Sequence, residues 1–357
     1  MEPYETNDQL VDAVAQRADD YRVVARGPGG RPVVAATGGG EREPAIMLTA
    51  GAHATEQAGV RAAVELLDRL DTDHRVHVIP TRDPVGVDGI EAALGDAIGE
   101  TVSVSDYDEL ADLLRSAGRV LVDEGGVVVA LVGDHGFGTV RPPEGESSSH
   151  HLSDVLSDLE GSPEVEPLRG RRVFLVPGHP DVEGTCHFDR LYTRVFTPEG
   201  ENLHLNRFIG SDWAPPESTA VRELADEVEP SLFVDLHEYA GDGYWVSVRP
   251  KADEAARQRE VAIGREMIES VGDVGGYRLP LAEFMSEPPA FFSELAAGLW
   301  DLDYGARGEG YNATDYVAEH HGLAFTNETG LYRPFAERVD MTVRSVQRAV
   351  SAFEERC

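Results

Sequence analysis

Apolar and polar positions follow two different periods along this chain. Short, largely apolar runs at 45–50, 173–176 and 232–236 predict buried strands. The segment VRAAVELLDRLD, at 60–71, places its apolar residues three and four positions apart and so predicts an amphipathic helix. Because predicted strands and helices alternate, we expect an α/β fold, with a mixed, mostly parallel sheet of about eight strands and helices on both faces.

One part of the chain departs from this regular alternation. We expect a single catalytic domain over residues 1–357, with residues 91–170 as an insertion or loop region within it. That region contains the polar stretch RPPEGESSSHHLSD, at 141–154, which is typical of a surface loop. Its adjacent His150 and His151 could bind a metal, but so polar a setting favours solvated side chains.

Composition sets the broad class of the protein. The chain has 357 residues, 41% of them hydrophobic, which is enough for a sizeable core. No apolar run approaches the ~18 residues that a membrane-spanning helix needs. The first ten residues, MEPYETNDQL, are acidic and polar, so we expect no signal peptide and a cytoplasmic protein.

The formal net charge of −34 excludes nucleic acids and anionic membranes as natural partners. Lys251 is the only lysine, and this combination with a large acidic excess indicates adaptation to a high-salt cytoplasm. Most carboxylates of such an acidic, halophilic protein serve solvation. Only carboxylates in apolar or motif contexts are therefore candidates for chemistry.

The first such context is TAGAHATEQAG, at 49–59, which follows a predicted strand. His53 and Glu56 could simply start a helix, or they could bind a metal. A catalytic zinc needs about three protein ligands and one open position. His237 follows the predicted strand 232–236 and supplies the third ligand, so the sequence predicts a Zn²⁺ site at His53, Glu56 and His237.

Three further acidic residues lie near predicted strand ends. Asp235, two positions before His237, could orient that ligand or could be a plain strand-end residue. We expect its neighbour Glu238 at the surface. Glu328, in the apolar context AFTNETG, is the candidate general base, which takes a proton from the zinc-activated water and passes it to the leaving nitrogen.

Asn206 and Arg207, in the segment ENLHLNRFIGSDW, are candidates for binding the substrate. An arginine fork binds a carboxylate through two parallel hydrogen bonds, and an asparagine adds a donor. The alternative is a structural Arg–Asp pair. Together with the other motifs, the segment favours a pocket for a substrate carboxylate.

These motifs, in this order, resemble the zinc carboxypeptidase superfamily, which includes carboxypeptidases A and B and the succinylglutamate desuccinylase and aspartoacylase branch. The matching segments are GAHATEQAG, LHLNRF, LFVDLHEY and AFTNETG, which together span most of the chain. The resemblance implies the family's mixed sheet flanked by helices. It also implies zinc held by His53, Glu56 and His237, with Glu328 as the general base.

The resemblance implies two more catalytic positions. The family's arginine that polarises the scissile carbonyl corresponds by spacing to Arg194, with Arg190 second and Arg82, in the other candidate turn TRDPVG, third. The mobile tyrosine of true carboxypeptidases corresponds to Tyr304, with Tyr311 as the fallback. Each tyrosine could instead be an ordinary loop aromatic.

The sequence thus predicts a zinc-dependent hydrolase that cleaves an amide bond next to a free carboxylate. Its substrate is either a peptide, as for a metallocarboxypeptidase, or an acyl-amino acid, as for an N-acyl amino acid amidohydrolase. Tyr304 discriminates between them, because the acylase branch lacks that tyrosine. A third hypothesis is a non-catalytic metal- or ligand-binding protein on this scaffold. A serine hydrolase is disfavoured, since the chain has no G-x-S-x-G motif.

Overall fold

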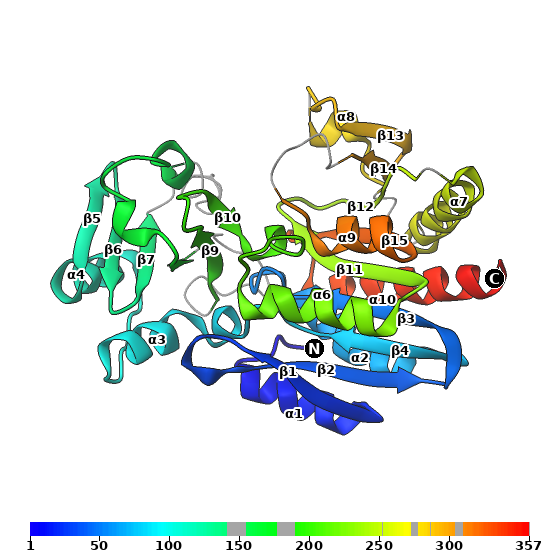
Figure 1. The fold of residues 1–357 in the computed structure, drawn as a ribbon, viewed down its shortest axis with the longest axis horizontal. Coiled ribbons are helices and arrows are strands. Elements are labelled where there is room, and N and C mark those ends of the chain that lie inside the picture. Colours follow the sequence, from blue (N-terminus) through cyan, green and yellow to red (C-terminus); the bar gives the residue numbers. More distant parts are fainter. Residues whose placement is uncertain are drawn as a thin grey trace.

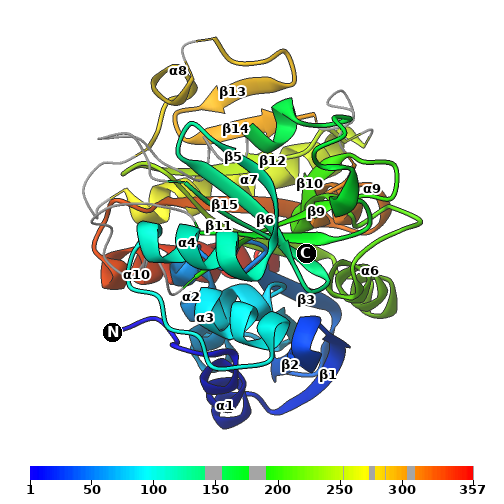
Figure 2. The same cartoon turned by 90° about the vertical axis from the view of Figure 1, so that its left-hand side faces the viewer.

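Two sheets and the helices around them form the computed structural model, whose arrangement Figures 1 and 2 show from two sides. The structure describes residues 1–140, 155–176, 190–251, 253–272, 278–285, 287–303 and 310–356. A mixed nine-stranded sheet lies between helices on both faces, which confirms the predicted α/β class. A six-stranded sheet lies at one end of the molecule (Figure 1).

The nine-stranded sheet has the strand order β1-β2-β4-β3-β11-β15-β12-β14-β13. Its strands, in that order, are Asp20–Arg26, Pro32–Gly39, His74–Ile79, Arg42–Ala50, Leu232–Tyr239, Leu323–Gly330, Tyr244–Val248, Leu299–Leu302 and Phe292–Ala296. The central strands β4, β3, β11 and β15 are parallel, as is the pair β12–β14. The remaining pairs are antiparallel, so hairpins at both edges make the sheet larger and more evenly mixed than the sequence suggested.

The six-stranded sheet has the order β10-β9-β8-β7-β6-β5. From β5 to β10 its strands are Arg119–Glu124, Val127–Val132, His135–Val140, Arg172–Leu175, Tyr192–Phe196 and Asn202–His204. The region 91–170 therefore supplies only half of the strands in this sheet. Strands β9 and β10 lie on the side that faces the nine-stranded sheet, and Figure 2 looks at the molecule from this end.

Helices cover both faces of the nine-stranded sheet. The helices are α1 Asn7–Arg17, α2 Gln57–Arg69, α3 Pro84–Ile98, α4 Tyr107–Ala117, α6 Pro216–Val228, α7 Glu254–Val271, α8 Leu281–Phe284, α9 Ala313–His320 and α10 Phe335–Glu354. Helices α1, α2, α7 and α10 pack on one face, and α6 and α9 pack on the other. Helices α3 and α4 pack on the six-stranded sheet. Within the described ranges, no helix combines the length and the apolar character needed to cross a membrane.

The alternation of side chains along the strands decides which residues share a face of the nine-stranded sheet. Side chains of successive residues in a strand point to opposite faces of the sheet. On β11, Val234 and Leu236 pack in the core beneath α2 and α10, whereas Asp235 and His237 point to the face that α6 and α9 cover. Glu328 on β15 is the register partner of His237, so it lies on the same face. The carboxyl ends of the central strands thus gather the ionisable side chains at one edge.

Candidate metal centre

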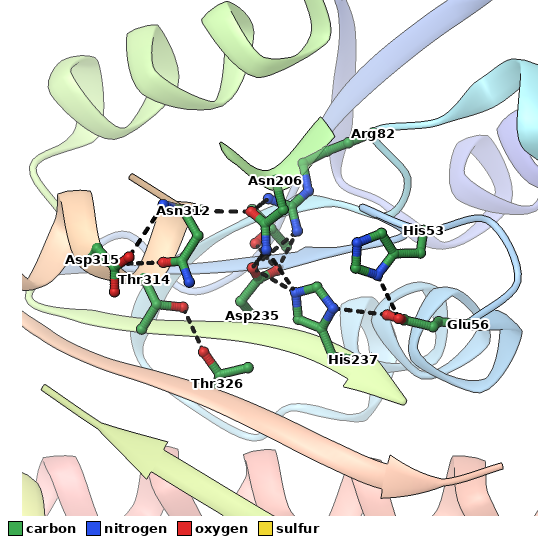
Figure 3. Close-up of polar contacts among 12 residues, drawn as sticks. His53, Glu56, Arg82, Asn206, Asp235, His237, Asn312, Thr314, Asp315 and Thr326 are labelled. Carbon is green, nitrogen blue, oxygen red and sulfur yellow. Dashed lines mark hydrogen bonds and ion pairs between the residues drawn. The ribbon is translucent and has the colours of Figure 1, made fainter. Parts of the chain in front are cut away.

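His53, Glu56 and His237 converge at the carboxyl ends of β3 and β11, as Figure 3 shows. His53 lies in the turn after β3, Glu56 directly precedes α2, and His237 is on β11. The Glu56 carboxylate lies between the two imidazoles, with Oε1 2.5 Å from Nδ1 of His53 and Oε2 2.8 Å from Nδ1 of His237. Glu56 makes no side-chain cap to α2, so its carboxylate faces the histidines instead of the helix.

The electrostatics of these three groups suit a cation. Burial alone would raise the pKa of Glu56, but the two imidazoles outweigh it and lower the pKa to about 2. Burial would lower the pKa of His237, but the Asp235 and Glu56 carboxylates raise it well above its ordinary value. Burial lowers the pKa of His53. A positive charge is therefore favoured between Glu56 and His237, at the centre of the group.

The donor set fits a transition metal such as zinc. One donor atom from each of His53, Glu56 and His237 lies within 4.8 Å of the others, and among the described residues this is the only such group of three or more. Two imidazole nitrogens and one carboxylate form a known ligand set of catalytic zinc sites, which leave a fourth position open. The predicted triad is thus brought together as a candidate metal site.

A buried network of hydrogen bonds contacts the candidate ligand His237 through Asp235 (Figure 3). Asp235 Oδ2 lies 2.9 Å from Nε2 of His237, which fixes the hydrogen on that nitrogen. Arg82 Nη2 donates to both carboxylate oxygens of Asp235, at 2.7 and 2.9 Å, and Thr49 Oγ1 donates to Oδ1 at 2.7 Å. These partners outweigh burial and lower the pKa of Asp235 below its usual range. Asp235 is therefore an orienting residue and not a plain strand end.

Glu328 lies beside this group, on the neighbouring strand β15. Burial raises the pKa of its carboxyl group to about 8, although His237 opposes the shift. The negative charges of Glu56 and Asp235 add to the effect of burial. A carboxyl group with a pKa near neutrality exchanges protons readily in that range, as a general acid–base group must.

The three candidate arginines take different positions. Arg82 is part of the network behind His237 and also donates to Asn206 Oδ1 at 2.9 Å. Arg190 donates to the backbone carbonyls of Tyr4 and Val87, which is a structural role. Arg194 on β9 donates through Nε to Asn202 Oδ1 at 3.0 Å. Of the three, Arg82, which sequence spacing ranked third, lies closest to the candidate ligand His237 through its pair with Asp235.

Asn206 and Arg207 lie side by side in the short η3 helix, Leu205–Arg207, above the sheet. Asn206 Nδ2 lies 3.2 Å from Nε2 of His237, and both residues are buried. Arg207 and Arg194 line a cavity of about 600 Å³, whose wall also includes Tyr311. Tyr311 is 38% exposed. Tyr304, His150 and His151 lie outside the described residues.

Sequence reasoning missed two residues and misplaced one. His204 on β10 lies with Nδ1 3.0 Å from Nε2 of His53, and Tyr192 on β9 stacks on the His53 ring with centroids 4.9 Å apart. The available signal was the position of His204 in LHLNRF, two residues before Asn206. The expectation that Glu238 lies at the surface is wrong. Glu238 is buried, accepts the backbone N–H of Ala58 and pairs with Arg338, because α2 and α10 cover that face of β11.

Comparison by sequence finds no relative: no protein-family model matches the chain, and no curated protein matches it. Comparison by structure does find proteins of similar fold. A metallo-carboxypeptidase from Burkholderia cenocepacia matches with a TM-score of 0.53 at 12% identity, over 99% of this chain and 70% of that one. A metallo-carboxypeptidase from Pseudomonas aeruginosa, in complex with (2-guanidinoethylmercapto)succinic acid, matches with a TM-score of 0.51 at 12% identity, over the same shares.

A candidate metallopeptidase from Shewanella denitrificans matches with a TM-score of 0.52 at 11% identity, over 99% of this chain and 91% of that one. These likenesses confirm the predicted fold. The chain has the fold of the metallo-carboxypeptidases, and the His53–Glu56–His237 group lies at the carboxyl ends of its central strands.

Proposed function

We propose that the chain is a zinc-dependent hydrolase that cleaves an amide bond next to a free carboxylate, acting as a metallocarboxypeptidase. The observation that supports this most is the convergence of His53, Glu56 and His237, with Glu328 on the same face of the sheet. A metal-assisted hydrolase needs about three neutral or anionic metal ligands. It also needs an adjacent group, such as a carboxyl group of raised pKa, that can exchange a proton.

His53, Glu56 and His237 would hold the metal, and the metal, when bound, supplies a Lewis acid that polarises the amide carbonyl and acidifies water. Nearby Asp235 keeps the hydrogen of His237 on Nε2 and so leaves Nδ1 free to coordinate. Arg82 neutralises the buried Asp235 charge and thereby holds the carboxylate in place.

Glu328 is the general base in this proposal. It removes one proton from the attacking water as the water oxygen bonds to the carbonyl carbon. It then delivers that proton to the amide nitrogen as the carbon–nitrogen bond breaks, which releases an amine and a new carboxylic acid. The raised pKa of about 8 favours the first of these transfers, because a carboxylate whose conjugate acid is weaker is a stronger base.

Arginines would bind and polarise the substrate. Arg207 and Asn206 would hold its free carboxylate, and Arg194 would polarise the scissile carbonyl from the β9 side. Tyr192 links Arg194 to the candidate metal site, since its ring stacks on His53 and its hydroxyl group bonds to Arg194. The Pseudomonas carboxypeptidase was solved with a succinic acid derivative, which carries carboxylates, and this supports a carboxylate-bearing substrate here.

The test compares peptides that have a free carboxyl terminus with the same peptides amidated, in high salt with zinc present. We expect release of the carboxyl-terminal amino acid from the free peptides only, since amidation removes the charge that Arg207 would bind. Cleavage of N-acyl amino acids with no cleavage of peptides would replace the carboxypeptidase by the acylase. No hydrolysis of either class by zinc-loaded protein would contradict a hydrolase altogether.

A further inference from the structure

The two histidines of the candidate metal site are held by chemically different partners. His237 Nε2 lies 2.9 Å from a carboxylate oxygen of Asp235, on its own strand. His53 Nε2 lies 3.0 Å from Nδ1 of His204, on β10 of the six-stranded sheet. A metal-binding histidine usually gives its second N–H to a carboxylate, a carbonyl or a water. An imidazole in this role is unusual.

The hydrogen positions follow from the contacts. With a metal held at Nδ1 of His53, on the side of Glu56, the hydrogen of the His53 ring is on Nε2, which donates to His204. Nδ1 of His204 must then be the unprotonated acceptor. The ring of His53 is also held from its face, since Tyr192 on β9 stacks on it at an interplanar angle of 27°. Both restraints come from the six-stranded sheet.

We propose that His204 is a positioning residue that fixes the tautomer and orientation of His53, so that the six-stranded sheet takes part in metal binding. This inference rests on the proposed metal site. The acceptor for His53 is neutral, whereas the acceptor for His237 is anionic. Charge-assisted hydrogen bonds are roughly twice as strong as neutral ones, so His53 is the more weakly supported ligand.

The test replaces His204 and measures zinc affinity by competition with a chelator, together with the visible absorption spectrum of the cobalt-substituted protein. His204→Phe keeps a ring but loses the acceptor, so we expect zinc binding to weaken about 10- to 100-fold. His204→Asn and His204→Asp place an oxygen near the position of Nδ1. We expect near-wild-type affinity from His204→Asn and tighter binding from His204→Asp, with a shifted cobalt spectrum.

His135→Phe is the matched control, because His135 lies on β7 of the same sheet and packs edge-on against Phe174. We expect zinc affinity of that variant to equal that of the wild type. Wild-type affinity and an unchanged cobalt spectrum in His204→Phe would overturn the inference. If His204→Phe does not fold, equal affinities for His204→Asn and His204→Asp would overturn it. A wild-type protein that binds neither metal would instead contradict the proposed function.

Discussion

The two sheets of this protein contribute to the candidate metal centre in different ways. Strands β3, β11 and β15 of the nine-stranded sheet lead to the ligands and to Glu328, at positions set by where each strand ends. The six-stranded sheet contributes Tyr192, Arg194 and His204, which contact the ligands or line the adjacent cavity. The nine-stranded sheet therefore positions the residues of the proposed chemistry. The six-stranded sheet supplies side chains that contact His53 and that line the cavity.

This difference shows how two sheets of one molecule can divide the positioning of one candidate site. Parallel strands direct side chains to one edge by geometry alone, so ligand positions follow from the topology. The six-stranded sheet meets that edge through His204 and Tyr192, which contact the candidate ligand His53. Four predictions test whether the division of roles is real.

The largest effect is expected from Glu328→Gln, which removes the proposed base from the nine-stranded sheet. We expect kcat/KM to fall about 10²- to 10⁴-fold, the usual contribution of a general base, while zinc content stays at the wild-type level. Elemental analysis and peptide hydrolysis measure the two quantities. Glu223→Gln, on the exposed side of α6, is the control and should keep full activity. Full activity in Glu328→Gln would remove Glu328 from the mechanism.

Arg82→Met probes the buried network behind His237. It leaves the Asp235 carboxylate without its main counter-charge, and breaking a buried pair in this way costs about 3–5 kcal/mol of unfolding free energy. Chemical denaturation followed by circular dichroism measures the loss. The control is Arg115→Met, beside the six-stranded sheet, where an exposed pair with Asp123 is broken. We expect no measurable change in the unfolding free energy of Arg115→Met. Equal losses of unfolding free energy in both variants would contradict a special role for the buried pair of Arg82 and Asp235.

Arg207→Gln tests the cavity that Arg207 and Arg194 line beside the six-stranded sheet. Loss of a charged hydrogen bond to the substrate carboxylate should lower kcat/KM about 10- to 100-fold, with most of the change in KM. Arg194→Gln should instead lower kcat, since Arg194 is proposed to act on the scissile carbonyl. Steady-state kinetics with one peptide substrate distinguish them. The reverse pattern would exchange the roles of the two arginines.

The smallest effect concerns pH and the zinc-stripped protein. Because the fold raises the pKa of Glu328 from 4.5 to about 8, the folded state binds more protons than the unfolded state between these values. This group therefore lowers the free energy of unfolding as pH rises through that window. We expect Glu328→Gln to be more stable than the wild type by about 1–3 kcal/mol above pH 8, and equal to it near pH 4. A difference in unfolding free energy that does not change with pH would show that it does not come from protonation of Glu328.

Sequence reasoning reached the fold and the group of three residues that could hold a metal, because both depend on local patterns. His53, Glu56 and His237 each follow or end an apolar strand, and parallel strands bring such ends together. Glu328 was found in the same way. The edge hairpin β13–β14 enlarged the sheet beyond the expected size, since register at an edge depends on tertiary packing.

Other residues were out of reach because their roles depend on contacts between distant segments. His204 ends a three-residue strand, which has no periodicity to detect, and it acts through a ring nitrogen of a residue 151 positions away. The buried pair of Arg82 with Asp235 could not be predicted, because spacing to a family turn carries no information about it. Glu238 was misplaced because nothing local indicates that α2 and α10 cover it.

The most direct test of the account is elemental metal analysis of protein purified in high salt, for the wild type beside His237→Ala. The account predicts about one zinc per wild-type chain and almost none in the variant, because His237 completes the ligand set across the sheet. No stoichiometric metal in the wild type, even after zinc is added back, would contradict it. His53 and Glu56 would then be no more than the start of helix α2.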